Sequence, residues 1–267
     1  MPYCSVPQEI LFLARNHVIL RAEVGSTVYG TGLPGHEDHD EMAVYVMPPH
    51  HVLGTKPVET VDWRTADQGE RSGPEDTDLV MHSAKKYITL AAAGNPSILV
   101  PLFTPRDKVF ECTQEGLMLR EAAELFVSKR TGGRFLGYMQ GQRKRMEDSR
   151  AGLRSPRVNR PELIEEFGYD TKYAMHMLRL GYQGIEIIRH GALEFPIEGS
   201  PGGVLRAVRR GELSYEEVLE LADQLEIVLR STIATSTRPD RPEPYAVDRL
   251  IARITFSAWG VPERSRG

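Results

Sequence analysis

Cysteine is scarce in this chain of 267 residues, where only Cys4 and Cys112 are present. Without a CxxC pair they offer neither a disulfide framework nor a thiolate metal site, and they are typical of a reducing compartment. The chain also lacks a run of eighteen apolar residues and a basic N-terminal segment followed by an apolar core. These absences argue against a transmembrane helix and a secretory signal peptide. We therefore expect a cytoplasmic protein that does not bind a membrane.

An excess of positive charge is missing as well. The formal net charge is −4 and the pI is about 6.1, which argues against a whole molecule that binds nucleic acid non-specifically. Residues 129–160 differ from the rest, because ten lysines or arginines stand there against Glu147 and Asp148 only. Such a run is either a solvated helix face or a guide for a polyanion, and the sequence leaves both open.

The periodicity of apolar residues changes near residue 105. Before it, period-two patterns predict strands at 18–26, 38–47 and 78–83, with helices at 8–16, 84–94 and 97–103. Residues 50–77 are rich in turn formers, contain one short strand candidate at 58–63, and are expected to form a mobile excursion. After residue 105 helical periodicity dominates, at 114–130, 133–150, 161–190, 214–233 and 245–258. We expect an α+β fold with an N-terminal sheet domain, 1–105, and an α-helical domain, 106–267.

Three serines stand where helices are expected to begin. Ser5 with Gln8, and Ser214 with Glu217, have the spacing of a capping box, and Ser83 can cap the helix that follows it.

The stretch 25–46 holds the candidate chemistry. Gly25 and Ser26 form a turn after a strand, where backbone amides can approach a phosphate closely because glycine has no side chain. Asp38 and Asp40 would share one face of the next strand, with Cα atoms about 6.6 Å apart at roughly 3.3 Å per residue. Two such carboxylates can bind hard divalent cations, which prefer carboxylate and phosphate oxygens.

A third carboxylate is expected on the strand at 78–83. Asp78 shares a face with Val80 and His82, and it is preferred to Asp76 because its position alternates correctly with the strand. His82 is either a site-lining residue or a hydrogen-bonded core residue. An acid on a neighbouring strand could bind a second metal ion and accept the proton of an attacking hydroxyl.

The ordered Gly25-Ser26, Asp38-x-Asp40 and Asp78 resemble the DNA polymerase beta-type nucleotidyltransferase superfamily. The similarity is closest to the RNA-ligase-associated branch of predicted nucleotidyltransferases, and it extends over nearly the whole chain, through residues 25–49, 76–103, 167–191 and 211–226. It implies a small mixed sheet with helices and a helical second half that completes the substrate cleft. It also implies use of a nucleoside triphosphate such as ATP with Mg²⁺, or Mn²⁺, as the metal.

The resemblance assigns Asp38, Asp40 and Asp78 as catalytic and metal-binding residues. Transfer of a nucleoside monophosphate to a hydroxyl, with release of pyrophosphate, is the implied reaction. An RNA end is our first choice of acceptor, ahead of a protein or a small molecule. The predicted nucleotide-binding residues are Gly25, Ser26, Tyr29, Gly30, Lys85, Lys172, His176 and Arg179.

The chain departs from that branch at three positions. Thr27 stands where an arginine usually follows Gly-Ser, and Met42 and Ala43 stand where an Arg-Gly pair usually follows the second aspartate. Phosphate contacts are therefore expected elsewhere, from Lys85 or from the helical face shared by Lys172, His176 and Arg179. The same departures motivate an alternative, a nucleotide-binding or regulatory protein without turnover.

A zinc hydrolase is a weaker alternative. His36, Asp38 and His39 match the second half of an HxHxDH signature, but Pro34 occupies the place of the first histidine. The oligomeric state is not fixed by the sequence.

Overall fold

Two compact units make up the structure, a computed structural model that describes residues 2–32, 39–67, 73, 75–153 and 160–261. The first, here called the sheet unit, contains Met1–Ala93, Ser97–Phe126 and Pro242–Gly267. The second, the helical unit, contains Gly94–Pro96 and Val127–Arg241. The chain therefore leaves the sheet unit, builds the helical unit and returns. The domain boundary expected at residue 105 stays a prediction.

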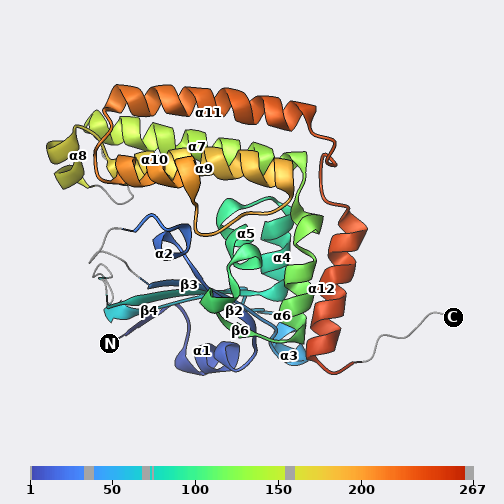
Figure 1. The fold of residues 1–267 in the computed structure, drawn as a ribbon. Coiled ribbons are helices and arrows are strands. Elements are labelled where there is room, and N and C mark those ends of the chain that lie inside the picture. Colours follow the sequence, from blue (N-terminus) through green and yellow to red (C-terminus); the bar gives the residue numbers. More distant parts are fainter. Residues whose placement is uncertain (1, 33–38, 68–72, 74, 154–159, 262–267) are drawn as a thin grey trace. The chain divides into compact units, whose positions relative to one another are not determined.

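A six-stranded mixed sheet forms the centre of the sheet unit (Figure 1). Its strand order is β1-β4-β5-β3-β2-β6. Only the pair β3 and β5 is parallel, and all the other neighbours are antiparallel. The strands span Pro2–Cys4 (β1), Val18–Val24 (β2), His39–Tyr45 (β3), Thr60–Asp67 (β4), Thr77–Ser83 (β5) and Val109–Cys112 (β6). The expected mixed sheet is thus confirmed.

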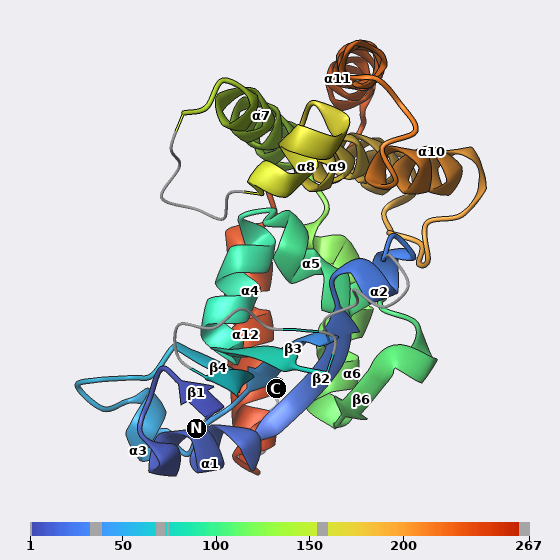
Figure 2. The ribbon, with the colours of Figure 1, turned by 90° about the vertical axis from the view of Figure 1, so that its left-hand side faces the viewer.

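Helix α1 (Gln8–Arg15) covers one face of this sheet (Figures 1 and 2). Its buried Leu11 and Ala14 pack against alternate strand residues, among them Ala43, Leu79 and Met81. The alternation follows from the pleat, which sends every second side chain to the same face. Two short helices lie at strand ends, α2 (Ser26–Tyr29) after β2 and α3 (Pro49–Val52) after β3.

Helix α4 lies over the opposite face and contacts β3 and β5. Helix α12 packs against α4 and α6, and it is fixed to the sheet where the Trp259 indole Nε1 donates to the carbonyl of Met47 over 2.9 Å. Residues 244–258 are therefore part of the sheet unit although they follow the helical unit in the chain. The elements here are α4 (Ala84–Ala92), α5 (Pro96–Phe103), η1 (Arg106–Lys108), α6 (Gln114–Glu121), η2 (Ala123–Phe126) and α12 (Pro244–Ala258).

Helix α9 is the central element of the helical unit, and α7, α10 and α11 pack against it. Glycines allow close packing, because a Cβ at Gly184 would lie 2.9 Å from the Cβ of Phe135 on α7 and 3.0 Å from Leu229 on α11. The helices are α7 (Lys129–Arg150), α8 (Pro161–Phe167), α9 (Thr171–His190), α10 (Gly199–Arg209) and α11 (Tyr215–Thr235).

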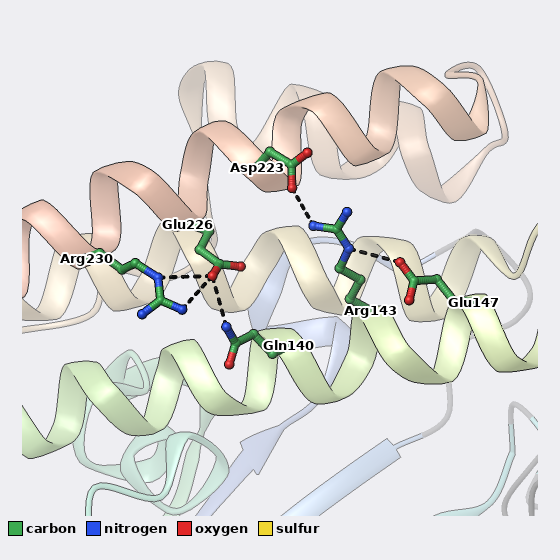
Figure 3. A network of polar contacts seen from close by, with 6 residues as sticks. All are labelled: Gln140, Arg143, Glu147, Asp223, Glu226 and Arg230. Atoms are coloured by element: carbon green, nitrogen blue, oxygen red, sulfur yellow. Dashed lines mark hydrogen bonds and ion pairs between the residues drawn. The ribbon is translucent and has the colours of Figure 1, made fainter.

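A polar network joins α7 to α11 on the surface of the helical unit (Figure 3). The guanidinium of Arg143 binds Glu147 within α7 and Asp223 on α11. Glu226 on α11 accepts from Gln140 over 2.9 Å and from Arg230. Most of these contacts are exposed, so each contributes little stability.

Most expected elements are present, and the differences have local causes. Ser83 and Ser214 cap helices as expected, but Ser5 does not, because Pro7 is the N-cap of α1 without a side-chain bond. Instead the Ser5 hydroxyl accepts from the amide of Asp62 over 2.8 Å and joins the start of the chain to β4. The segment expected to be a mobile excursion contains the eight-residue β4, a full member of the sheet. In the described part of the chain, no helix combines the length and apolar character needed to cross a membrane.

Candidate nucleotide and metal site

Gly25 directly follows β2 and has a backbone conformation that other residues rarely adopt. Its φ of 79° and ψ of −159° fall in a region that is essentially restricted to glycine. It is the N-cap of the single-turn helix α2, which contains Ser26 and Tyr29 and ends at Gly30, also at positive φ. Four of the predicted nucleotide-binding residues therefore belong to one compact turn at the end of β2.

The carboxylate of Asp40 lies directly against this glycine. Val24, the residue before Gly25, is the register partner of Asp40 on β3. A Cβ added at Gly25 would overlap Oδ2 of Asp40 and lie 3.0 Å from its Cγ. The close approach explains why the turn requires glycine and ties the turn to the position of Asp40.

Asp78 lies beside Asp40 on the neighbouring strand. The two are register partners in the parallel pair β3 and β5, and adjacent strands are separated by about 4.8 Å. The expectation that Asp78 belongs to an adjacent strand is thus confirmed. Asp38 lies outside the described residues, so its position relative to this pair stays a prediction.

Asp76, the rival for the third acid, is engaged in the turn before β5. Its carboxylate accepts from the amide of Gly73 over 2.9 Å and from the Thr65 hydroxyl over 2.6 Å. These two bonds hold the pKa of Asp76 below its usual value. A carboxylate with this role shapes a turn, which favours Asp78 as the acid of the site.

Arg64 is a residue of this region that sequence reasoning missed. It is the register partner of Asp78 on β4, so Asp40, Asp78 and Arg64 form a row across three neighbouring strands. The expected strand ended at residue 63 and left Arg64 outside it. The β-branched Thr65, which continues the alternate positions of Val61 and Trp63, was the signal that could have extended the strand.

Lys108 also holds the turn in place, through contacts with β2 and with α2. Its ammonium donates to Oε2 of Glu23 over 2.6 Å and to the backbone carbonyl of Thr27 over 3.4 Å. The Thr27 hydroxyl donates to the carbonyl of Val24 over 3.2 Å. Thr27, a departure from the expected arginine, thus takes part in closing the turn.

Two other predicted features are not at this end of the sheet. Lys85 lies beyond the opposite end of β5 from Asp78. The five steps from Asp78 to Ser83, the last residue of β5, span roughly 16 Å at about 3.3 Å per residue. His82 is buried near that end and its Nδ1 lies 3.1 Å from the hydroxyl of Thr60. Burial lowers the pKa of His82, which fits a neutral, hydrogen-bonded core residue.

Lys172, His176 and Arg179 belong to α9 of the helical unit. Helix α9 is continuous over this segment, so their i, i+4 and i+7 spacing places them along one face, as expected. Arg179 is buried and donates to Oε1 of Gln183 over 2.6 Å. The pKa of His176 is well below its usual value, because of burial first and then of nearby cations such as Arg179 and Lys172. The lowered pKa favours the neutral form of His176.

Three of the seven lysines and arginines of α7 pair with carboxylates. Arg143 binds Glu147 and Asp223, Lys144 lies 3.2 Å from Asp148, and Lys129 lies 3.4 Å from Asp240. These exposed pairs favour the interpretation of this run as a solvated helix face.

Oxygen donors are the ligands that a hard divalent cation requires, and Asp40 and Asp78 supply them side by side. Among residues 2–32, 39–67, 73, 75–153 and 160–261, no three histidine, cysteine or acidic side chains gather as a metal site. Asp38, the third predicted ligand, is not in those ranges.

Comparison with known protein families identifies the family of the chain. The model of the family described as "RNA repair pathway DNA polymerase beta family" (RlaP) matches residues 8–201, well over half of the chain. A solved nucleotidyltransferase-like protein from Exiguobacterium sibiricum 255-15 matches at 10% identity and a TM-score of 0.30, over 94% of this chain and 75% of that one. A likeness this weak carries no argument. The search of curated proteins gave no match.

Proposed function

Because the chain belongs to the RNA repair pathway DNA polymerase beta family, we propose that it transfers a nucleoside monophosphate from a triphosphate to a hydroxyl acceptor. The single observation that carries the proposal is the pairing of Asp40 with Asp78 in register beside Gly25. An acid pair packed against a glycine turn combines metal ligands with backbone amides that can reach a phosphate. We further propose that the protein acts in the cytoplasm.

In the proposed reaction the acceptor oxygen attacks the α-phosphorus. A new phosphorus–oxygen bond forms, the bond to the bridging oxygen of the β-phosphate breaks, and pyrophosphate leaves with that electron pair. Asp78 accepts the proton of the acceptor hydroxyl. The amides of the Gly25-Ser26 turn and the Ser26 hydroxyl donate to phosphate oxygens, and Tyr29 and Gly30 shape the far side of that turn.

The residues present fit a magnesium or manganese ion. Asp40 and Asp78 would hold it together with Asp38, and the ion would neutralise charge on the phosphates. Lys172, His176 and Arg179 are proposed as additional nucleotide contacts. Lys85 is left out, since it lies at the other end of β5.

RNA is the proposed acceptor, because the family is described by its link to RNA repair. Transfer to a protein or a small molecule instead of RNA is the alternative result that the experiment must distinguish.

Label transfer tests the proposal directly. The protein is incubated with each α-labelled nucleoside triphosphate, magnesium, and a panel of RNA ends, proteins and small alcohols. We expect label on RNA and stoichiometric pyrophosphate, both lost in Asp40→Asn and Asp78→Asn. Asp62→Asn is the matched control, since Asp62 is exposed on the neighbouring strand β4. Absence of transfer to every acceptor would refute the proposal.

A nucleotide-binding protein without turnover remains the second candidate, favoured by Thr27, Met42 and Ala43 at positions where family members usually differ. Calorimetry separates the two. Triphosphate binding that survives Asp40→Asn, with no turnover in either protein, would favour the binder. Joint loss of metal binding and turnover would favour the enzyme.

A further inference from the structure

Arg64 lies beside the acid pair and on the same face of the sheet. It is the register partner of Asp78, so the two side chains leave neighbouring strands in the same direction. Asp40 is one strand further along the sheet. With about 4.8 Å between strands, the Cα of Arg64 is roughly 5 Å from that of Asp78 and roughly 10 Å from that of Asp40. An arginine side chain can therefore reach a ligand that binds next to Asp78.

Tyr3 holds the guanidinium of Arg64 from the neighbouring edge strand. It is the register partner of Arg64 on β1, and the Cζ atom of Arg64 lies 4.9 Å from the centroid of the Tyr3 ring. The amide of Ser5 donates to the carbonyl of Asp62 over 2.9 Å, and the Ser5 hydroxyl accepts from the amide of Asp62, which fastens β1 to β4 beside this pair. A cation–π contact holds the charge and leaves the N–H donors able to bind an oxygen acceptor.

The protein offers this guanidinium an aromatic ring but no acceptor for one of its donors. In the part of the chain that the structure describes, the Nε atom of Arg64 is buried without a hydrogen-bond partner. An arginine that keeps its charge requires oxygen partners, and an unpaired donor lowers stability. Because the residue as a whole is only half-buried, a ligand can approach the guanidinium from solvent. This environment favours an anion beside Asp78.

The strand order distinguishes the acceptor side of the site from the triphosphate side. Gly25 follows β2, so the proposed phosphate-binding turn is on the β2 side of Asp40. Arg64 is on the other side of the acid pair, beyond Asp78. In phosphoryl transfer the attacking and leaving oxygens are roughly in line, on opposite sides of the phosphorus. With the leaving pyrophosphate at the turn, the attacking hydroxyl comes from the side of Asp78 and Arg64.

We propose that Arg64 binds the phosphate of the RNA acceptor that is next to the attacking hydroxyl. The proposal deepens the function proposed above and rests on it for the identity of the acceptor. A guanidinium binds phosphate oxygens through paired donors, so this contact would hold the acceptor hydroxyl beside Asp78. Tyr3 is a positioning residue that acts through Arg64.

Binding of a short single-stranded RNA with free terminal hydroxyls tests this contact without requiring catalysis. Fluorescence anisotropy on the full chain, with magnesium and at several KCl concentrations, measures the affinity. We expect Arg64→Gln to weaken binding roughly tenfold, because a charge-assisted hydrogen bond is lost. The slope of log affinity against log salt should become shallower by about 0.7, the value for one phosphate contact on a single strand. Arg64→Lys keeps the charge, so it should keep the slope and recover part of the affinity.

Arg15→Gln is the matched control. The Cζ atom of Arg15 lies 4.2 Å from the centroid of the Trp63 ring, so this arginine also rests on an aromatic side chain. Trp63 packs with the cluster under α1, on the opposite face of the sheet from Arg64. Its loss should change RNA affinity by less than about twofold and leave the slope unchanged. Equal effects of Arg64→Gln and Arg15→Gln, or an unchanged slope in Arg64→Gln, would overturn the proposal.

Variants of Tyr3 test its positioning role. Tyr3→Phe keeps the ring and should bind RNA as wild type does. Tyr3→Leu should weaken binding roughly two- to fivefold, the effect of losing one exposed cation–π contact. Combining Tyr3→Leu with Arg64→Gln should add no further loss, because Tyr3 acts through Arg64. Additive losses in the double variant would show that Tyr3 does not act through Arg64, and would overturn that part of the proposal.

Kinetics with both substrates keep this inference separate from the proposed function. If transfer to RNA occurs, Arg64→Gln should raise KM for RNA and leave KM for the triphosphate unchanged. The opposite result, or transfer only to a protein or a small molecule, would overturn the inference while the transferase proposal stands. If no transfer occurs but RNA binding depends on Arg64, the RNA contact stands and the transferase proposal fails. No RNA binding by wild type would overturn the inference.

Discussion

Gly25→Ala is the substitution that most sharply tests the link between the turn and the acid pair. The added Cβ would overlap Oδ2 of Asp40 at a backbone φ of 79°. Holding a non-glycine residue in this region costs about 1–3 kcal/mol. The overlap must be relieved as well, and the flexible partner is the Asp40 carboxylate.

The expected result has two parts. The free energy of unfolding should fall by roughly 1–3 kcal/mol, seen as a lower midpoint in urea. Turnover should fall by about 100-fold or more, since displacing a catalytic group by about 1 Å has an effect of that size. The loss of activity should therefore exceed what the loss of stability explains at a temperature where the variant is folded.

Gly133→Ala is the matched control, because a Cβ at Gly133 on α7 meets nothing within 4 Å. There alanine should stabilise the helix, by about 0.5–1 kcal/mol, and leave activity unchanged. If Gly25→Ala had the same stability and turnover as the Gly133→Ala control, the proposed coupling between Gly25 and Asp40 would be refuted.

Three further outcomes are expected. Burial raises the pKa of Glu186 to about 7 from an ordinary 4.5, so folding favours its protonated form, and its stabilising effect is lost as pH rises through about 7. The free energy of unfolding, measured in urea, should fall more between pH 5 and pH 8 for wild type than for Glu186→Gln. An equal fall in the two proteins would contradict this. Asp170→Ala should lower the free energy of unfolding by roughly 3 kcal/mol or more, because it removes a helix cap and leaves Arg160 unpaired. Asp170→Asn should lower it less, because asparagine still caps the helix. Equal urea midpoints for the two variants would argue against the cap. Lys108→Met should speed amide hydrogen exchange in residues 25–30 and leave exchange in α4 unchanged. Adding Glu23→Gln to this variant should restore stability, because no carboxylate is then left without Lys108. The double variant should still exchange fast in residues 25–30, because Lys108 also binds the Thr27 carbonyl.

Local rules accounted for most of the sheet unit. Strict alternation in β5 predicted the face of Asp78, and its pairing with Asp40 confirms the adjacent strand. The two edge strands, β1 and β6, were missed because three or four residues are too few for a period to be visible. The strand β4 was cut short at residue 63, and with it the register position of Arg64 was lost.

The helical unit was predicted as helix, with Lys172, His176 and Arg179 as its predicted nucleotide-binding residues. Helix α10 was overlooked because it begins with glycines and a proline, GSPGG, which are poor helix formers held there by packing. Helices α8 and α9 were merged, although Gly168 at positive φ and the cap Asp170 separate them. The meeting of Arg160 and Arg209 at the start of α9 joins residues forty-nine positions apart, and no local pattern reports such tertiary contacts.

The position of α12 in the sheet unit has a consequence for synthesis on the ribosome. Strands and helices of residues 2–126 are made first, yet the helix whose Trp259 binds Met47 is made after the whole helical unit. Residues 127–241 can complete their packing while the nascent sheet unit still exposes the surface that α12 will cover. We expect a ribosome-bound chain, in which residue 241 is followed by a linker long enough to span the exit tunnel, to protect the helical unit from protease and leave α4 open to cleavage. Equal protection of both units at that length would contradict this order.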